Sequence, residues 1–163
     1  MHDIYKLSQP VIDIINPLAK MELFQTSFYT RLGAIANNLG FLVAEQYFYA
    51  ESNEEKTHFD MWKDYVLGRG NDFDVPTIEA PDLSGKSLYE LSELALEIEA
   101  EVSSMYQDAA VKVFPICQMT YRKMQEFIKI QEEAMKFYVD VCTVLVGLDK
   151  TGELVVEKTL FKA

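Results

Sequence analysis

The sequence predicts an all-α protein: a bundle of four long helices with one long crossover, followed by a short fifth helix. Two observations lead to this prediction. Apolar residues recur at steps of three and four along four stretches of the chain, as expected for helices that bury one face. Residues 71–86, by contrast, contain Pro76, Pro81 and Gly85 and carry no helical pattern, which indicates one long connection in the middle of the chain.

Composition favours one ordinary globular domain spanning residues 1–163. The chain has 163 residues, of which 49% are hydrophobic, enough for a single sizeable core. Its net charge of −11 disfavours nucleic acid and anionic membranes as partners, and favours cations that enter from solution. The pattern of a signal peptide or of a membrane span is absent, and Cys117 and Cys142 are too few for a disulfide framework. We therefore expect a cytoplasmic protein with reduced thiols.

The first helix has two possible starts. Ser8 precedes Pro10, and Asn16 precedes Pro17, so each pair places a capping residue before a proline near the first helical position. The helix either begins at Pro17, or begins near Pro10 and kinks at Pro17. Its apolar arc, within which Glu22 and Tyr29 also fall, consists of Leu18, Met21, Phe28, Leu32, Ile35 and Ala36.

The second helix is expected from about Phe41 to Leu67, after a tight connection that ends at Gly40. At about 1.5 Å per residue this helix is about 40 Å long. At about 3.3 Å per residue, residues 71–86 can reach roughly 50 Å. The connection can therefore run the length of the bundle and leave the second and third helices parallel. The apolar stripe of the second helix consists of Phe41, Ala44, Phe48, Ser52, Glu55, Phe59, Trp62 and Val66.

The last three helices follow from capping and breaking residues. Ser87-Leu-Tyr-Glu90 is a capping-box pattern that starts the third helix, Pro115 separates it from the fourth, and Gly147 closes a bundle of about 10–147. Residues 152–162 predict a short terminal helix, whose many apolar residues we expect to pack against symmetry-related subunits. The predicted stripes are Leu88, Leu91, Ala95, Val102, Tyr106 and Ala109 in the third helix, and Met124, Phe127, Ile128, Gln131, Met135, Tyr138, Cys142 and Leu145 in the fourth.

Three of these apolar stripes each contain one carboxylate: Glu22, Glu55 and Glu99. The fourth stripe contains Gln131, and His58 follows Glu55 by one turn on the same helix face. Each residue alone could be a satisfied core group or a misjudged surface position. A buried carboxylate without a partner is costly, however, and a cation is the most direct partner for several of them. Carboxylate and imidazole ligands suit iron, manganese or zinc, and two metals that share a bridging carboxylate suit redox iron best.

The sequence resembles the ferritins from about Leu18 to Leu160. The resemblance rests on motifs in the family's order: Glu22 with Tyr29 seven residues later, Glu54-Glu55-Lys-Thr-His58, Arg69-Gly70, Glu99-Ala-Glu-Val-Ser, Gln131-Glu-Glu-Ala134 and Gly152-Glu-Leu-Val-Val-Glu-Lys-Thr-Leu. It implies a ferritin-like bundle, iron storage with ferroxidase activity, and two iron ions per subunit. It also implies that dioxygen or peroxide is the oxidant and that the subunits form a homo-oligomeric shell of 24.

The resemblance further implies a role for each site residue. Glu22, Glu55 and His58 would hold the first iron, and Glu55 would bridge to a second iron held also by Glu99, with Gln131 nearby. Tyr29 would donate a hydrogen bond or an electron beside the pair. Glu54 would pass iron inward and, with Glu133, form at most a transient third site, because Ile130 and Ala134 stand where further acids would be needed.

Departures from relatives narrow the expected subfamily. Di-iron relatives often carry a second Glu-x-x-His motif on the fourth helix, where this chain has Gln131 and Ala134, so the centre resembles the heavy-chain type with a weaker second site. Lys56 follows the bridging Glu55 where haem-binding bacterioferritins have methionine, so we expect no haem. A non-storage di-iron oxidase or peroxidase, or a metal-buffering bundle that binds zinc or manganese without turnover, remains an alternative.

Overall fold

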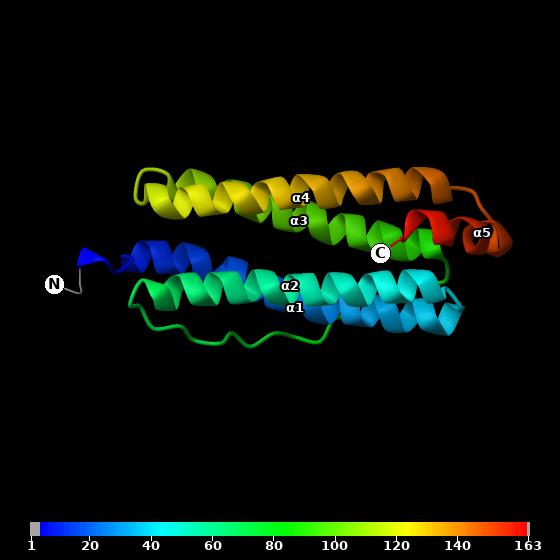
Figure 1. The fold of residues 1–163 in the computed structure, drawn as a ribbon, viewed down its shortest axis with the longest axis horizontal. Coiled ribbons are helices and arrows are strands. Elements are labelled where there is room, and N and C mark those ends of the chain that lie inside the picture. Colours follow the sequence, from blue (N-terminus) through cyan, green and yellow to red (C-terminus); the bar gives the residue numbers. More distant parts are fainter. Residues whose placement is uncertain (1–3, 163) are drawn as a thin grey trace.

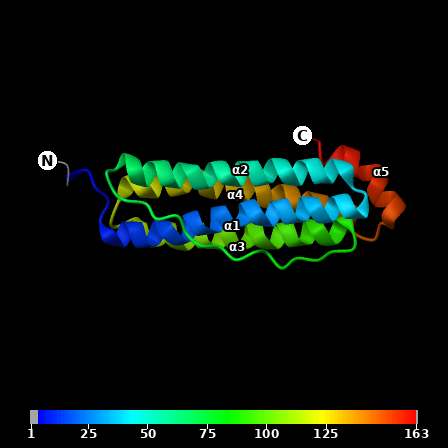
Figure 2. The ribbon, with the colours of Figure 1, turned by 90° about the horizontal axis from the view of Figure 1, so that it is seen from below.

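The computed structural model describes residues 4–162, and within them the regular structure is entirely helical (Figure 1). The helices are α1 (Gln9–Leu39), α2 (Leu42–Gly68), α3 (Leu88–Val113), α4 (Gln118–Leu145) and α5 (Lys150–Leu160). The first four lie side by side as a four-helix bundle, and α5 lies across one end of it (Figures 1 and 2). The predicted all-α bundle with a short fifth helix is therefore confirmed.

Helix α1 begins at the earlier of the two predicted starts and continues through Pro17. Pro10 lies in the first turn, where its missing N–H costs no intrahelical hydrogen bond. Gly40 ends the helix with a φ of 87°, a left-handed conformation that glycine adopts without steric cost. The next N–H, that of Phe41, returns to the carbonyl of Ala36, which closes the turn into α2.

The segment between α2 and α3 spans the bundle from one end to the other (Figures 1 and 2). It leaves α2 and α3 parallel, as the sequence predicted, while α1 runs antiparallel to both. Phe73 holds the start of this segment by an edge-on contact with Phe59, at 5.7 Å between ring centroids, and Leu83 packs against the core near its end. The crossover is therefore held against the bundle near both of its ends.

The capping box at Ser87 forms, with one change of partner. The side chain of Ser87 accepts a hydrogen bond from the N–H of Glu90 at 3.1 Å. The Glu90 carboxylate reaches back to the N–H of Lys86, at 2.7 Å, rather than to that of Ser87. These two side chains satisfy the N–H groups of Glu90 and Lys86, so the helix starts where the pattern predicted.

The predicted apolar stripes form the core, with small corrections. In α2 and α3 every predicted stripe residue is buried. In α4 the buried position after Tyr138 is Val141, and Cys142 is only partly buried, because the stripe there continues by a step of three rather than four. The other predicted stripe residues that are only partly buried are Met21, Ile128 and Met135.

Helix α5 begins slightly earlier than predicted, because the Asp149 side chain accepts a hydrogen bond from Gly152 N–H at 2.8 Å and caps the helix. Its apolar residues pack mainly on their own bundle. Phe161 is buried, with its ring centroid 5.8 Å from that of Phe48, whereas Val155 remains 70% exposed. Leu154, Val156 and Leu160 are partly buried against the core. The packing of this segment against symmetry-related copies stays a prediction.

Candidate metal centre

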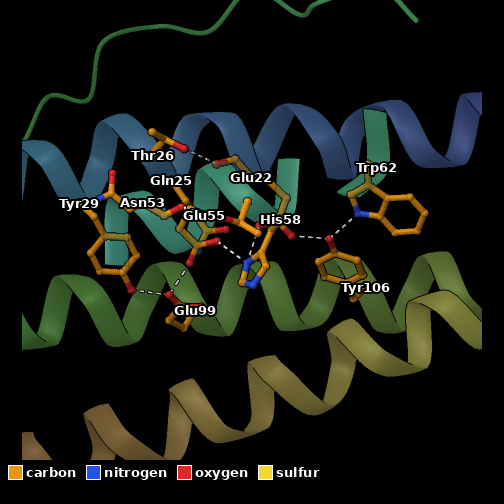
Figure 3. A network of polar contacts seen from close by, with 11 residues as sticks. Glu22, Gln25, Thr26, Tyr29, Asn53, Glu55, His58, Trp62, Glu99 and Tyr106 are labelled. Carbon is orange, nitrogen blue, oxygen red and sulfur yellow. Dashed lines mark hydrogen bonds and ion pairs between the residues drawn. The ribbon is translucent and has the colours of Figure 1, made fainter. Parts of the chain in front are cut away.

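Four of the predicted ligands converge between the helices of the bundle (Figure 3). Helix α1 contributes Glu22, α2 contributes Glu55 and His58, and α3 contributes Glu99; all four are buried. The helices place them there because each residue sits in the apolar stripe that faces the bundle axis. Three carboxylates and one imidazole therefore share a small volume inside the bundle.

Glu22, Glu55 and His58 form the tightest group. His58 Nδ1 lies 3.0 Å from Glu55 Oε2 and 3.5 Å from Glu22 Oε2. One potential ligand atom from each residue lies within 4.8 Å of the other two, a spacing that a single ion can bridge. The structure thus brings together the three residues predicted for the first iron.

A proton on His58 partly neutralises this group. Burial alone would lower the pKa of His58, but the hydrogen bonds and charges of Glu22 and Glu55 outweigh burial and raise that pKa to about 10. In the metal-free protein Glu22 and Glu55 therefore favour the protonated form of His58. An ion bound by the same atoms would displace this proton, because a ligating imidazole must be neutral.

Glu99 forms the other half of the cluster. Its Oε1 accepts hydrogen bonds from the Tyr29 hydroxyl and from Gln25 Nε2, the latter at 3.2 Å. Gln25 Nε2 also lies 3.5 Å from Glu55 Oε1, so this amide links the two carboxylates. Burial raises the pKa of Glu99 to about 7, and burial together with the charges of Glu22 and Glu99 raises the pKa of Glu55 well above its ordinary value.

Four buried oxygens in this cluster lack a hydrogen bond of acceptable geometry from the described residues: Glu22 Oε2, Gln25 Oε1, Glu99 Oε2 and Gln131 Oε1. Buried acceptors without donors are rare in folded proteins. All four are hard oxygen ligands, and two of them belong to carboxyl groups. Their chemistry fits cations bound between α1, α2, α3 and α4.

A pocket of about 280 Å³ connects this cluster to the surface between α2 and α4. Exposed Glu54 and Glu133 line it together with buried Glu99 and Gln131. Glu51, one turn before Glu55, lines the same pocket, and burial followed by the charge of Glu54 raises its pKa to about 7. A cation entering here would meet carboxylates along the whole path.

Gln25 and Glu51 were not predicted as site residues, and Tyr106 was predicted only as part of the core. The spacing contained a signal for the first two, since Gln25 is one turn from Glu22 and Glu51 one turn from Glu55. Tyr106 donates its hydroxyl hydrogen to Glu22, a contact that depends on how α3 is placed against α1. An aromatic residue in an apolar stripe gives no hint of such a partner.

The raised pKa values predict an unusual pH dependence for the metal-free protein. Glu51 and Glu99 titrate near pH 7 in the folded state and near 4.5 when unfolded, so the folded state holds extra protons between these values. His58, raised to about 10, acts in the same direction at higher pH. Stability should therefore be lost as pH rises through about 7 and gained as it falls towards 4.5.

We expect the urea midpoint, measured with excess chelator, to be higher at about pH 6 than at about pH 8. Glu99→Gln, which cannot titrate at this position, should show a smaller difference between the two pH values. A midpoint that is higher at the alkaline pH would contradict the electrostatics described here.

A family model described as a ferritin-like domain matches residues 12–145. The bacterial non-heme ferritin of Escherichia coli O157:H7 is 24% identical over 152 residues, which cover 90% of each chain, and the Shigella flexneri protein of the same name matches equally. An open pore ferritin from Archaeoglobus fulgidus superposes with a TM-score of 0.90 at 20% identity, over 98% of this chain and 99% of that one. A structure titled humanized archaeal ferritin gives the same TM-score and identity over 97% and 98%.

Proposed function

The chain belongs to the ferritin family, and we propose that it oxidises Fe(II) at a di-iron centre in each subunit and stores the ferric product in a 24-subunit shell. The observation that supports this proposal is the buried group of Glu22, Glu55, His58 and Glu99, with one unpartnered oxygen on each of Glu22 and Glu99. None of the described helices is long and apolar enough to cross a membrane. We further propose that the protein acts in the cytoplasm.

In this proposal iron is the substrate, and each residue has a defined task. Glu22 and His58 bind the first ion, Glu99 and the Gln131 oxygen bind the second, and Glu55 bridges the two. Glu55 suits this role because its Oε2 faces His58 while its Oε1 lies on the side of Gln25 and Glu99. Glu54 and Glu51, which line the pocket, attract Fe(II) and pass it inward.

The two ions together supply the electrons that the oxidant needs. Each Fe(II) gives up one electron, and two electrons with two protons reduce one dioxygen to hydrogen peroxide. Anionic carboxylates stabilise the ferric charge more than the ferrous charge, so Glu22, Glu55 and Glu99 favour the oxidised products. The Tyr29 hydroxyl, which bonds Glu99, lies beside the second ion, where it can donate a hydrogen bond or an electron.

Oxygen uptake and particle size together test the proposal. Addition of Fe(II) to the metal-free protein should consume dioxygen, and size-exclusion chromatography with light scattering should show a large particle that retains iron after aerobic loading. Oxygen uptake by a small particle that retains no mineral would instead identify a non-storage di-iron oxidase. Binding without oxygen uptake would identify a metal-buffering bundle, and either result would contradict the proposal.

A further inference from the structure

The same spacing of glutamate and tyrosine occurs twice around the centre. Tyr29 follows Glu22 by seven residues on α1, and Tyr106 follows Glu99 by seven residues on α3. The two helices run antiparallel, and each tyrosine donates a hydrogen bond to the glutamate on the other helix. Tyr29 donates to Glu99 Oε1, and Tyr106 donates to Glu22 Oε1 (Figure 3). The carboxylates of Glu22 and Glu99, each of which faces one ion only and is here called a terminal carboxylate, are thus held by matching contacts from opposite sides.

Trp62 fixes the direction of the Tyr106 hydroxyl. Its indole Nε1–H donates to the Tyr106 oxygen at 2.8 Å. Indole nitrogen is only a donor, so the tyrosine oxygen accepts this bond, and its own hydrogen is directed to Glu22. The ring of Tyr106 is stacked on Phe127, at 5.0 Å between centroids and 6° between planes, and both Trp62 and Tyr106 are fully buried. The hydroxyl therefore has little freedom to turn away.

The bond from Tyr106 decides which oxygen of Glu22 is free. Oε1 is occupied by the hydroxyl, whereas Oε2 lies 3.5 Å from His58 Nδ1 and lacks a hydrogen bond of acceptable geometry from the described residues. Glu99 has the same arrangement, with Oε1 occupied and Oε2 free. Each terminal carboxylate thus presents a single oxygen to the space between the helices.

We propose that Tyr106, oriented by Trp62, is a positioning residue for the first iron, as Tyr29 is for the second. It keeps Glu22 bound to the ion through Oε2 alone, which leaves a coordination position open that a chelating carboxylate would fill. This inference rests on the proposed di-iron centre. It assigns a function to two core aromatics, and it predicts that the two tyrosines act on different ions.

The test uses Co²⁺, whose visible absorption reports coordination number without turnover. In Tyr106→Phe we expect affinity at the first site to fall about 10- to 100-fold, the range typical for partners of metal ligands. The visible absorption of Co²⁺ at the first site should also weaken, because Glu22 becomes free to bind through both oxygens. The affinity of the second site should stay within about threefold of that of the parent. Tyr29→Phe should show the reverse pattern. Anomalous diffraction from crystals soaked at increasing Co²⁺ identifies which site fills first.

Two further variants separate positioning from general packing. Trp62→Phe keeps a large ring but removes the donor, so it should weaken the first site in the same direction and by less. Tyr65→Phe removes a tyrosine hydroxyl that bonds Thr120 at 2.9 Å, away from the centre, and should bind Co²⁺ like the parent.

Parental affinities and spectra in Tyr106→Phe would overturn the inference, as would equal losses at both sites. A parent that binds no Co²⁺ would contradict the proposed function as well, whereas two bound ions unaffected by Tyr106→Phe would overturn this inference alone.

Discussion

Glu55→Ala is expected to lose rapid Fe(II) oxidation while the metal-free bundle remains folded. Among the described ligands, Glu55 alone has one oxygen beside His58, at 3.0 Å, and the other on the side of Glu99, through Gln25. Its removal leaves both ions short of a ligand at once. The rate should fall by more than the roughly 10- to 100-fold typical of changes outside the ligand set.

The metal-free fold should tolerate this change because the carboxylate is itself unfavourable there. Burial and the charges of Glu22 and Glu99 raise the pKa of Glu55 well above its ordinary range, so ionising Glu55 at neutral pH works against folding. The shorter side chain leaves a small cavity, which offsets part of this gain. We expect a denaturation midpoint close to that of the parent in chelator.

Stopped-flow absorbance after mixing with Fe(II) and oxygen measures the rate. Glu132→Ala, which removes an exposed carboxylate on α4, is the matched control and should oxidise iron at the parental rate. Tyr29→Phe should fall between the two, because it removes only a hydroxyl and leaves every ligand in place. Parental rates in Glu55→Ala would mean that oxidation occurs elsewhere in the protein.

The positions of the helices were predictable because burial and capping each depend on residue types at nearby positions in the sequence. The apolar stripes, the Ser87 cap and the long unpatterned crossover each follow from residues close together in the chain. Two details were not local. Whether α1 passes through Pro17 depends on packing that keeps Ile15 and Leu18 buried on either side, and the choice of Val141 over Cys142 depends on the facing helices.

The candidate site likewise contains residues that the sequence could predict and residues that it could not. An acidic residue in an apolar stripe is unusual and can be recognised from the sequence alone, so Glu22, Glu55 and Glu99 could be predicted as site residues. Tyr106 and Trp62 could not, because aromatic residues are what a core stripe normally contains. The hydrogen bonds of their polar atoms depend on how α1, α2 and α3 pack together, because this packing places the Tyr106 hydroxyl next to Glu22.

Two further acids escaped notice for the opposite reason, because glutamates on a short terminal helix look like solvated surface. Glu153 and Glu157 are nevertheless 2% and 4% exposed, on the face of α5 that meets the bundle. The Glu153 carboxylate accepts hydrogen bonds from the N–H groups of Leu88 and Tyr89, at 3.0 and 2.9 Å. Glu157 accepts one from Ala44, at 3.3 Å. Each acid thus satisfies donors in the first turn of another helix, where no intrahelical acceptor exists.

Glu153→Ala should therefore be the most destabilising single change on α5. It leaves the buried N–H of Leu88 without an acceptor and removes a negative charge from the positive end of α3, a loss of about 2–3 kcal/mol. Glu157→Ala loses one longer bond and should cost about 1 kcal/mol. For a chain of this size these losses correspond to decreases in Tm of roughly 4–12 °C and 2–4 °C respectively. Calorimetry in chelator, with light scattering to establish that all variants share one oligomeric state, measures both, and Glu132→Ala again serves as control. Equal, negligible shifts for the two α5 variants would show that Phe161 and its aromatic neighbours alone hold this helix to the bundle.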